Sequence, residues 1–317
     1  MKPNRQYKIY RHKFVTPLRT AHGNWSVRES IILREKSNEG RISFGELCPT
    51  PGFNTSTIEE LLPLVEAWVA GLDFQFNHLM QSAISCLASE IWNTSYNVES
   101  KSDVFSAELI TLSKSVGNIS TTYKKKIGIK IIEVEIREVE KILNSISKES
   151  MIRLDANESL SVEELLKWNE AFANETRIQF IEQPLQRDKI AELLSVEKEL
   201  SVPLALDESL VWKNDLSFFE KKGWQGFYVI KPCLFPNWKK TITFIRSQPL
   251  RSVVSTVFES PFGYEAVARC AFLSNQVAGL DRSLFKLNAK EFPQHHRRPL
   301  SSESLSISVL DQLWGEL

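Results

Sequence analysis

The sequence has few cysteines and no excess of charge of either sign. Only four of its 317 residues are cysteine, and their spacing is not that of a zinc site. Lys and Arg together number 39, as do Asp and Glu, so no bulk charge favours nucleic acid or an anionic membrane as a partner. The longest stretch without formal charge, residues 74–89, contains several polar side chains and indicates a packed helix, not a membrane span. With no apolar signal segment at its start, the chain is expected in the cytoplasm with reduced thiols.

Two common catalytic patterns are also missing. The sequence contains no Gly-x-x-x-x-Gly-Lys-Ser/Thr phosphate loop and no Gly-x-Ser-x-Gly motif. The pair His295-His296 lies in a polar, arginine-containing segment, which is typical of a surface loop. Candidate catalytic residues must therefore come from other side chains.

Three acidic residues stand at nearly equal intervals, each at the end of an apolar, strand-like run. Asp155 ends Met-Ile-Arg-Leu-Asp, Glu182 ends Ile-Gln-Phe-Ile-Glu and Asp207 ends Pro-Leu-Ala-Leu-Asp. The intervals of 27 and 25 residues fit one strand, one helix and two short loops of a parallel βα repeat. The carboxyl ends of barrel strands carry the active site. Three carboxylates meeting there repel each other unless a cation lies among them, and oxygen ligands favour Mg²⁺, with Mn²⁺ as a substitute.

Lysines lie on the strands before and after these acids. Lys231 closes the next apolar run, 24 residues after Asp207, and Lys124 and Lys126 share one face of the strand before Asp155. A lysine held near a dication and other lysines has a lowered pKa, as a general base at neutral pH requires. For single residues, a solvated basic edge, a helix cap or a salt bridge at the rim remain the alternatives. Candidates for substrate binding or for support of the ligands are Lys124, Arg153, Asn157, Glu208, Ser255 and Thr256.

The chain is expected to have three parts. Residues 1–103 indicate strands followed by helices, an α+β pattern, with a capping box at Ser56 and Glu59. Its expected strands are Tyr7–Val15, Ser26–Glu35 and Arg41–Glu46, and its second helix is Met80–Trp92. Residues 104–285 alternate strands with helices and predict a parallel barrel. Its expected strands are Ala107–Leu112, Lys124–Lys130, Met151–Asn157, Ile178–Gln183, Pro203–Glu208, Gly226–Pro232, Ser252–Phe258 and Gly279–Phe285. Residues 286–317 are expected to pack back on the first part.

Taken together, five short motifs resemble the enolase superfamily, muconate-lactonizing subgroup. They are Lys-x-Lys at 124–126, Asp-x-Asn at 155–157, Glu-x-Pro at 182–184, Asp-Glu at 207–208 and Lys-Pro at 231–232. The resemblance implies a modified (β/α)₇β barrel (a TIM barrel variant) with an α+β capping domain. Within the superfamily, the chain looks most like the o-succinylbenzoate synthase family, on the stretches Pro17–Gly23, Gly45–Phe53, Arg153–Asn157 and Ser255–Ser260. The last stretch departs from that family in having fewer serines.

The resemblance implies a lyase with a small-molecule carboxylate as substrate. Mg²⁺ on Asp155, Glu182 and Asp207 would bind the carboxylate, Lys126 would act as the base, and Lys231 would stabilise charge from the opposite face. The implied reaction is dehydration of 2-succinyl-6-hydroxy-2,4-cyclohexadiene-1-carboxylate to 2-succinylbenzoate, in menaquinone or phylloquinone biosynthesis. Three alternatives stay open: an N-succinylamino-acid racemase or dipeptide epimerase with two basic lysines, a non-catalytic barrel, and a barrel enzyme whose charged rim is structural. The sequence carries no signal for an oligomeric state.

Overall fold

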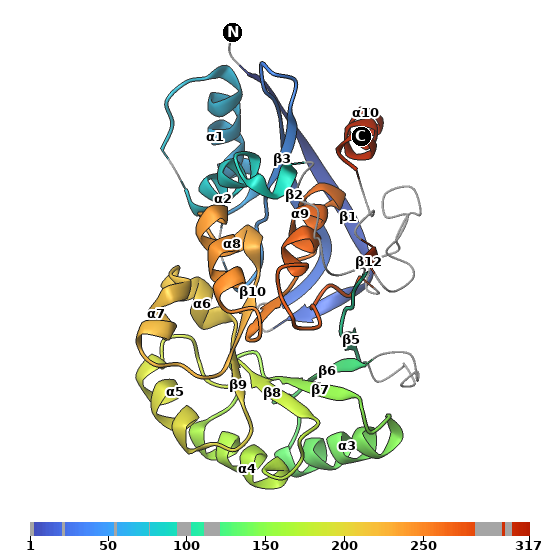
Figure 1. Ribbon diagram of the computed structural model, residues 1–317, viewed down its shortest axis with the longest axis vertical. Coiled ribbons are helices and arrows are strands. Elements are labelled where there is room, and N and C mark those ends of the chain that lie inside the picture. The colour runs from blue at the N-terminus through green and yellow to red at the C-terminus, as the bar shows by residue number, and fades with distance from the viewer. Residues whose placement is uncertain are drawn as a thin grey trace. The chain divides into compact units, whose positions relative to one another are not determined.

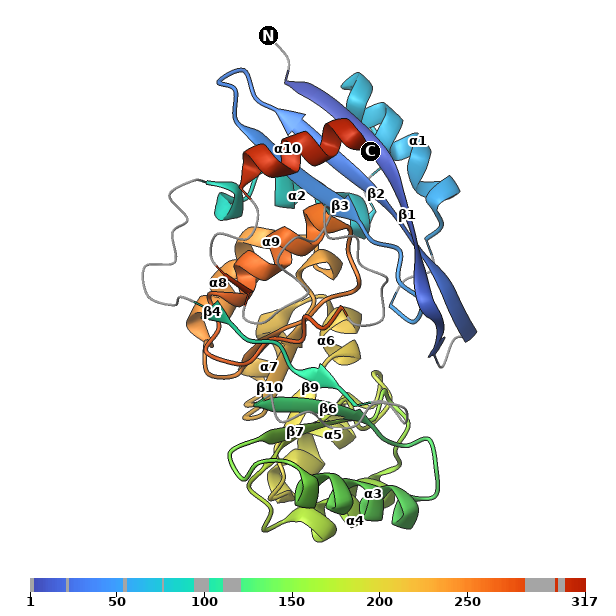
Figure 2. The same ribbon diagram turned by 90° about the vertical axis from the view of Figure 1, so that its right-hand side faces the viewer.

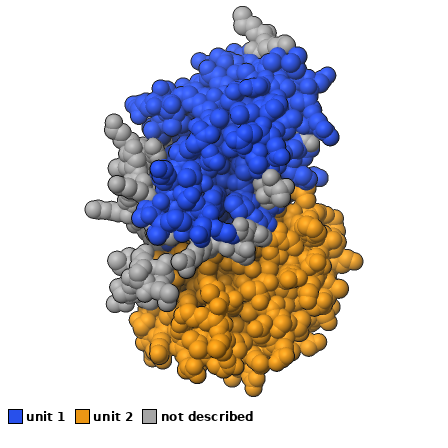
Figure 3. All heavy atoms as spheres, turned by 180° about the vertical axis from the view of Figure 1, so that it is seen from behind, with its two compact units in different colours: residues 1–105, 231–250, 254–317 blue, residues 106–230, 251–253 orange. Residues whose placement is uncertain are grey.

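The computed structural model describes residues 3–20, 23–53, 56–75, 77–93, 103–110, 121–282, 300–301 and 306–317. The chain divides into two compact units, which Figure 3 colours separately. Unit 1 comprises Met1–Phe105, Lys231–Leu250 and Val254–Leu317, and unit 2 comprises Ser106–Ile230 and Arg251–Val253. In the described part of the chain, no helix is long and apolar enough to cross a membrane.

Unit 1 contains an antiparallel sheet in the order β1-β2-β3. Its strands are β1 (Asn4–Thr20), β2 (Gly23–Lys36) and β3 (Ile42–Leu47), so all three expected strands form, and the first two are longer than expected. Two helices follow, α1 (Ile58–Ala70) and α2 (His78–Leu87), with a 3₁₀ turn η1 (Glu90–Trp92). The second expected helix was too long, because the Ser89 side chain accepts a hydrogen bond from Ile91 N and begins a separate turn.

The capping box of α1 lies one residue later than predicted. Thr57, not Ser56, is the N-cap, and its side chain and that of Glu60 exchange hydrogen bonds with each other's backbone. Ser56 instead accepts a hydrogen bond from Asn77 Nδ2, the residue that caps α2. Both pairs fit the capping pattern, so the sequence alone does not separate them.

The remaining elements of unit 1 come from the second half of the chain. They are η3 (Pro232–Leu234), α8 (Trp238–Ser247), α9 (Pro261–Ala271), α10 (Ile307–Glu316), and the short antiparallel pair β4 (Asp103–Val104) and β12 (Leu300–Ser301). Figure 2 shows α10 lying along the β1-β2-β3 sheet. Trp314 of α10 contacts the Phe44 ring of β3, and Asp311 forms an ion pair with Arg34 of β2 at 2.6 Å.

Unit 2 is built on a parallel sheet in the order β11-β10-β9-β8-β7-β6-β5. The strands are β5 (Glu108–Leu109), β6 (Thr122–Lys126), β7 (Met151–Asp155), β8 (Ile178–Glu182), β9 (Leu204–Leu206), β10 (Phe227–Ile230) and β11 (Ser252–Val254). The helices between them are α3 (Ile132–Ser145), α4 (Val162–Phe172), α5 (Ile190–Val196) with the 3₁₀ turn η2 (Glu197–Glu199), α6 (Glu208–Lys213) and α7 (Leu216–Lys221). Figure 1 shows these helices on the outer side of the curled sheet. This alternation confirms the predicted barrel-type α/β fold with an antiparallel capping sheet.

Several strands are shorter than the sequence indicated. β6 ends at Lys126, not Lys130, because Gly128 follows in the left-handed region with φ of 74° and starts a turn. β11 ends at Val254, and the chain turns at Phe258, whose φ is 64°. Of the last expected strand, Gly279 forms a single parallel bridge with Ser255, and residues 283–285 lie outside the described residues. Residues 111–112 of the first expected strand also lie outside them.

Candidate active site

The three predicted metal ligands lie at the carboxyl ends of three adjacent strands. Asp155 ends β7 and Glu182 ends β8, and the two residues are paired in register. Asp207 directly follows β9, in which Ala205 pairs with Glu182. The three residues are 3%, 1% and 2% exposed, so water solvates them little. Burying three carboxylates together is costly unless other groups neutralise them.

Side-chain alternation explains why these acids share one face of the sheet. Phe180 and Glu182 are two residues apart on β8, and Ala205 and Asp207 are two apart at β9. Phe180 and Ala205 belong to a buried apolar cluster that also contains Val229 and Val253. Glu182 and Asp207 therefore each lie two residues beyond a member of this apolar cluster, at the carboxyl ends of their strands.

Lys124 of β6 bridges two of the carboxylates. Its Nζ lies 2.9 Å from Asp155 Oδ2 and 2.8 Å from Glu182 Oε1. Burial alone would lower the pKa of Lys124, but the fields of Asp155, Glu182 and Asp207 outweigh it and raise that pKa above its ordinary value. Lys124 therefore keeps its proton at neutral pH and is not suited to be the base.

The second lysine of the same strand, Lys126, pairs in register with Asp155 and is half-buried. The turn that follows it is held by Glu135, a buried residue in the first turn of α3. Its carboxylate accepts hydrogen bonds from three consecutive backbone N–H groups, those of residues 128–130, at 2.7, 3.0 and 3.1 Å. Glu135 therefore fixes the backbone next to the predicted base. Sequence reasoning missed this residue, because it reads as an ordinary acid in the first turn of a helix.

Lys231 directly follows β10, the strand next to β9 in the sheet. It is 9% exposed, and its Nζ lies 4.7 Å from the centre of the Phe53 ring. Both residues belong to unit 1. A buried ammonium group over an aromatic ring is a cation–π contact, so the Phe53 ring stabilises the positive charge of Lys231.

Arg153 lies below the carboxylate layer, as alternation predicted. It pairs in register with Phe180, and its guanidinium carbon lies 5.2 Å from the centre of the Phe180 ring. Nε donates a hydrogen bond to Gln179 Oε1 at 2.7 Å. Burial lowers the pKa of Arg153 to about 10, against the opposing effect of the nearby Glu182 charge.

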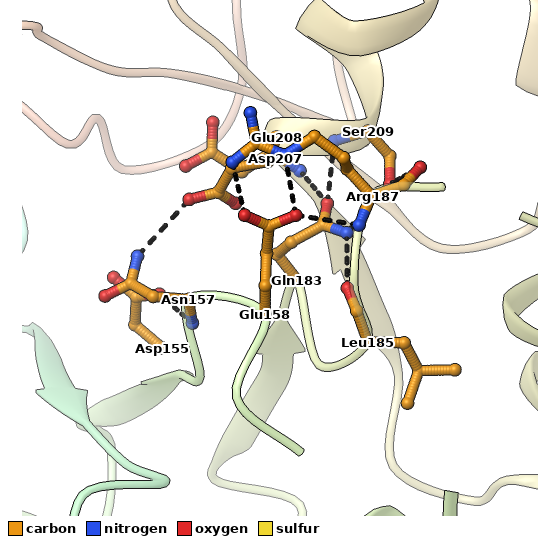
Figure 4. Close-up of polar contacts among 9 residues, drawn as sticks. All are labelled: Asp155, Asn157, Glu158, Gln183, Leu185, Arg187, Asp207, Glu208 and Ser209. Carbon is orange, nitrogen blue, oxygen red and sulfur yellow. Dashed lines mark hydrogen bonds and ion pairs between the residues drawn. The ribbon is translucent and has the colours of Figure 1, made fainter. Parts of the chain in front are cut away.

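Gln183 positions the end of β9, and sequence reasoning missed it. Its side-chain oxygen accepts hydrogen bonds from the N–H groups of Asp207 and Ser209, each at 3.0 Å, and its Nε2 donates to Leu185 O and Ser209 Oγ. Figure 4 shows these contacts. Gln183 is fully buried with φ of 36°. The signal in the sequence is that Gln183, a polar residue, lies between an acid that ends a strand and Pro184. At this position the chain has to leave the strand and turn.

A second pair of contacts supports the loop after β7 (Figure 4). Asn157 N donates to Asp155 Oδ1 at 3.2 Å, and Asn157 Nδ2 donates to Glu208 Oε1 at 3.5 Å. Glu158 forms an ion pair with Arg187 and accepts a hydrogen bond from its backbone N–H at 2.7 Å. Asn157 and Glu208 are thus placed beside the ligands, while Glu158 and Arg187 connect the loops after β7 and β8.

The hydroxyl groups of Ser255 and Thr256 take part in contacts within unit 1. Ser255 Oγ donates to Gly279 O at 3.2 Å. Thr256 Oγ1 donates to Glu259 Oε2 at 2.5 Å and accepts a hydrogen bond from Phe258 N at 2.8 Å. Their role in substrate binding stays a prediction, and these contacts show that they shape the turn after β11.

The carboxylate set suits a divalent cation by its chemistry. Among the described residues, no three acidic, cysteine or histidine side chains converge closely enough to hold an ion. What the carboxylates do hold is a cation, the Lys124 ammonium, which contacts two of them and is stabilised by the field of all three. A cluster of buried oxygen donors that already retains a positive charge fits a hard ion such as Mg²⁺.

Comparison with known proteins adds independent support for the resemblance. A family model described as Enolase C-terminal domain-like matches residues 112–232. The o-succinylbenzoate synthase of Thermosynechococcus vestitus is 27% identical over 290 residues, which cover 84% of this chain and 86% of the relative. The o-succinylbenzoate synthase of Escherichia coli is 29% identical over 272 residues, which cover 79% and 81%.

Solved structures share the fold over nearly the whole chain. The o-succinylbenzoate synthase of Thermosynechococcus elongatus, complexed with Mg in its active site, has a TM-score of 0.74 at 23% identity and covers 99% of this chain and 100% of its own. The L-Ala-D/L-Glu epimerase of Bacillus subtilis has a TM-score of 0.73 at 17% identity and covers 91% and 92%. The family model over residues 112–232 and the curated relatives that span most of its length show that this chain is similar to proteins of the enolase superfamily, and those relatives are o-succinylbenzoate synthases.

Proposed function

We propose that this protein is an o-succinylbenzoate synthase, a lyase that dehydrates 2-succinyl-6-hydroxy-2,4-cyclohexadiene-1-carboxylate to 2-succinylbenzoate in menaquinone or phylloquinone biosynthesis. The observation that carries the proposal is the set of buried acids Asp155, Glu182 and Asp207 at three adjacent strand ends. On one side of them in the sheet order lies β6, which contains Lys124 and Lys126, and on the other side lies β10, which Lys231 directly follows. The curated relatives with this name support the choice of substrate.

Asp155, Glu182 and Asp207 would hold Mg²⁺, which Mn²⁺ can replace. When bound, the ion supplies Lewis-acid stabilisation of the negative charge that develops on the substrate carboxylate. Asn157 donates its backbone N–H to Asp155, and Gln183 accepts the backbone N–H of Asp207, so both hold ligand residues in place.

Lys126 is the acid–base residue of the reaction. Its neutral amine takes the proton from the carbon next to the carboxylate, and the electron pair of the broken C–H bond is delocalised into that carboxylate. The resulting ammonium then gives the proton to the leaving hydroxyl as the C–O bond breaks. Water departs, and the ring becomes aromatic, which makes this step strongly favourable. One base on one face is sufficient for both proton transfers.

Lys231 stabilises the ring while it carries negative charge. Its ammonium group lies over the Phe53 ring, so this nitrogen forms a cation–π contact within the protein itself. Lys231 therefore needs its charge and not a change of protonation state. In the racemase and epimerase alternatives, both lysines would exchange protons with the substrate.

The cellular setting follows from composition. The four cysteines are free and buried, which fits a reducing cytoplasm. The equal numbers of acidic and basic residues give no reason to expect nucleic acid or a membrane surface as a partner.

The decisive experiment measures loss of diene absorbance when the purified protein is given the cyclohexadiene substrate and Mg²⁺. We expect turnover that stops in excess chelator and returns with Mg²⁺ or Mn²⁺. The epimerase alternative is tested on N-succinylamino acids and dipeptides in deuterated water. Absence of dehydration, together with exchange of the α-proton in those substrates, would replace the synthase by a racemase on the same scaffold.

A further inference from the structure

The ammonium group of Lys124 contacts two of the three predicted metal ligands. Its Nζ lies 2.9 Å from Asp155 Oδ2 and 2.8 Å from Glu182 Oε1, which are distances of charge-assisted hydrogen bonds. Both acids are almost fully buried. A monovalent side-chain cation therefore contacts two of the three acids that the proposed function assigns to a divalent ion.

Lys124 can leave these contacts without a change in the backbone. Its side chain is 24% exposed, whereas those of Asp155 and Glu182 are 4% and 2% exposed. The carboxylates are fixed at paired strand ends, and the lysine side chain has a flexible four-carbon stem. The mobile partner in the contact is therefore the cation.

The neighbouring Lys125 provides a natural comparison. It lies on the same strand with its side chain on the opposite face, where its Nζ is 3.3 Å from Glu138 of α3. Lys124 and Lys125 thus have the same chemistry and adjacent positions on one strand, but of the two only Lys124 contacts the predicted metal ligands.

We infer that Lys124 is an exchangeable counter-cation. It neutralises Asp155 and Glu182 while the metal is absent and gives up these contacts when a divalent ion binds. The inference rests on the proposed function, because it takes these acids to be metal ligands. The binding of the metal and the contacts of Lys124 are then negatively coupled. The lysine weakens metal binding, and in the metal-free protein it reduces the repulsion among the acids at the carboxyl ends of these strands.

A permanent structural ion pair makes a different prediction. If Lys124 kept its contacts beside the bound metal, its removal would destabilise the metal-free and metal-bound forms equally. If it is exchanged, removal destabilises only the metal-free form, because the ion takes over its charge. Metal affinity and stability, measured in both forms, therefore separate the two.

The test uses the full chain, freed of metal with a chelator that is then dialysed away. Mn²⁺ is titrated and the free ion is followed by electron paramagnetic resonance for the wild type, Lys124→Met, Lys125→Met and Lys124→Arg. We expect Lys124→Met to bind Mn²⁺ at least about tenfold more tightly than the wild type, because a like charge next to the ion is removed. Lys125→Met and Lys124→Arg should bind like the wild type, since neither changes the charge at the acids.

Thermal unfolding with and without saturating Mn²⁺ completes the test. Lys124→Met should unfold at a lower temperature than the wild type without metal, and the difference should disappear with Mn²⁺. A Lys124→Met variant that folds only with Mn²⁺ would be the strongest support. Equal or weaker Mn²⁺ binding by Lys124→Met, equal destabilisation in both forms, or failure to fold even with Mn²⁺ would overturn the inference. If the wild type binds Mn²⁺ and Lys124→Met binds it with the same affinity, the exchange is refuted and the proposed function is not affected. If no variant binds Mn²⁺, both the exchange and the metal site of the proposed function are refuted.

Discussion

Units 1 and 2 each bury a cluster of charged side chains, but they neutralise the charge in different ways. In unit 2, three carboxylates at strand ends depend on other charges, with Lys124 in direct contact with two of them. In unit 1, Glu46 is 2% exposed and is satisfied by neutral donors. Ser260 N donates to it at 2.9 Å and Gly263 N at 3.1 Å, both at the N-terminus of α9, and the Ser260 hydroxyl donates as well.

The rest of the unit 1 cluster follows the same pattern. Arg28 is fully buried, and it donates to the backbone oxygens of Phe258 and Glu29, each at 3.0 Å, and to that of Pro49. Glu259 accepts hydrogen bonds from Thr256 Oγ1 and Val257 N. These charges are held largely by backbone groups and a helix N-terminus, which are part of the fold itself.

The difference shows which buried charges serve structure and which are available for chemistry. A carboxylate satisfied by backbone donors belongs to one fixed geometry, and its removal costs stability. Carboxylates that share a side-chain cation need a positive charge beside them, and a metal ion can supply that charge in place of the side chain. The following predictions test this comparison.

The largest effect is expected for the predicted metal ligands. Asp155→Asn, Glu182→Gln and Asp207→Asn should each lose Mn²⁺ binding and lower turnover by about a thousandfold or more, because the ion supplies several kcal/mol of charge stabilisation. Undiminished turnover in excess chelator would contradict the metal site.

Replacement of Lys126 and replacement of Lys231 should affect different steps of the reaction. Lys126→Ala should abolish both dehydration and exchange of the substrate α-proton with solvent, because the base is lost. Lys231→Arg keeps the positive charge in another shape, so it should slow dehydration by about a hundredfold or more and still allow exchange. Proton exchange is followed by NMR in deuterated water. Exchange with only one enantiomer of a racemase substrate in each variant would indicate two bases and the epimerase chemistry.

Glu46→Gln should mainly cost stability. The amide nitrogen would face the N–H donors of α9, so we expect a loss of about 2–4 kcal/mol in the free energy of unfolding, measured with urea. Glu29→Gln is the matched control in the same sheet. Glu29 is 44% exposed in its ion pair with Arg11, so its replacement should cost less than about 1 kcal/mol. If Glu46→Gln weakened Mn²⁺ binding as much as Asp207→Asn, the two clusters would not be independent.

The acids at the strand ends could be predicted from the sequence, whereas the residues that hold them could not. Asp155, Glu182 and Asp207 end apolar runs at regular spacing, and the period-two alternation of a strand then places them on one face. The roles of Gln183 and Glu135 depend on loop backbones that bring several N–H groups to one side chain. No periodicity in the sequence encodes that convergence.

Strand ends were missed for a related reason. Val257 and Phe258 are apolar and resemble a continued strand, yet Phe258 has φ of 64°. Its ring packs edge-on against Phe14 and Trp25, whose ring centres lie 5.4 and 6.0 Å away. Contacts with residues more than 200 positions earlier in the chain stabilise a backbone conformation that local sequence disfavours.

The smallest predicted effect concerns an ion pair that stabilises unit 2 away from the carboxylates. Arg177 Nη2 lies 2.7 Å from Glu175 Oε2, and Arg177 Nη1 donates to Leu143 O of α3 at 2.8 Å, just before β8 begins. The hydrogen bond from the Arg177 side chain lowers the pKa of Glu175 below its ordinary value, more than partial burial raises it.

A group whose pKa is lower in the folded state adds stability above its unfolded pKa and loses it as the pH falls through the folded pKa. Glu175→Gln should therefore reduce the free energy of unfolding at pH 7 by about 0.5–1 kcal/mol. The difference from the wild type should shrink once the pH falls below the unfolded value of 4.5 and vanish below the folded pKa. Glu163→Gln, which breaks an exposed i,i+4 pair with Lys167 on α4, is the control and should reduce stability less than Glu175→Gln does. Urea unfolding from pH 3 to pH 7 measures both variants. A Glu175→Gln deficit that persists undiminished at the lowest pH would show that the side chain acts through packing and not through its charge.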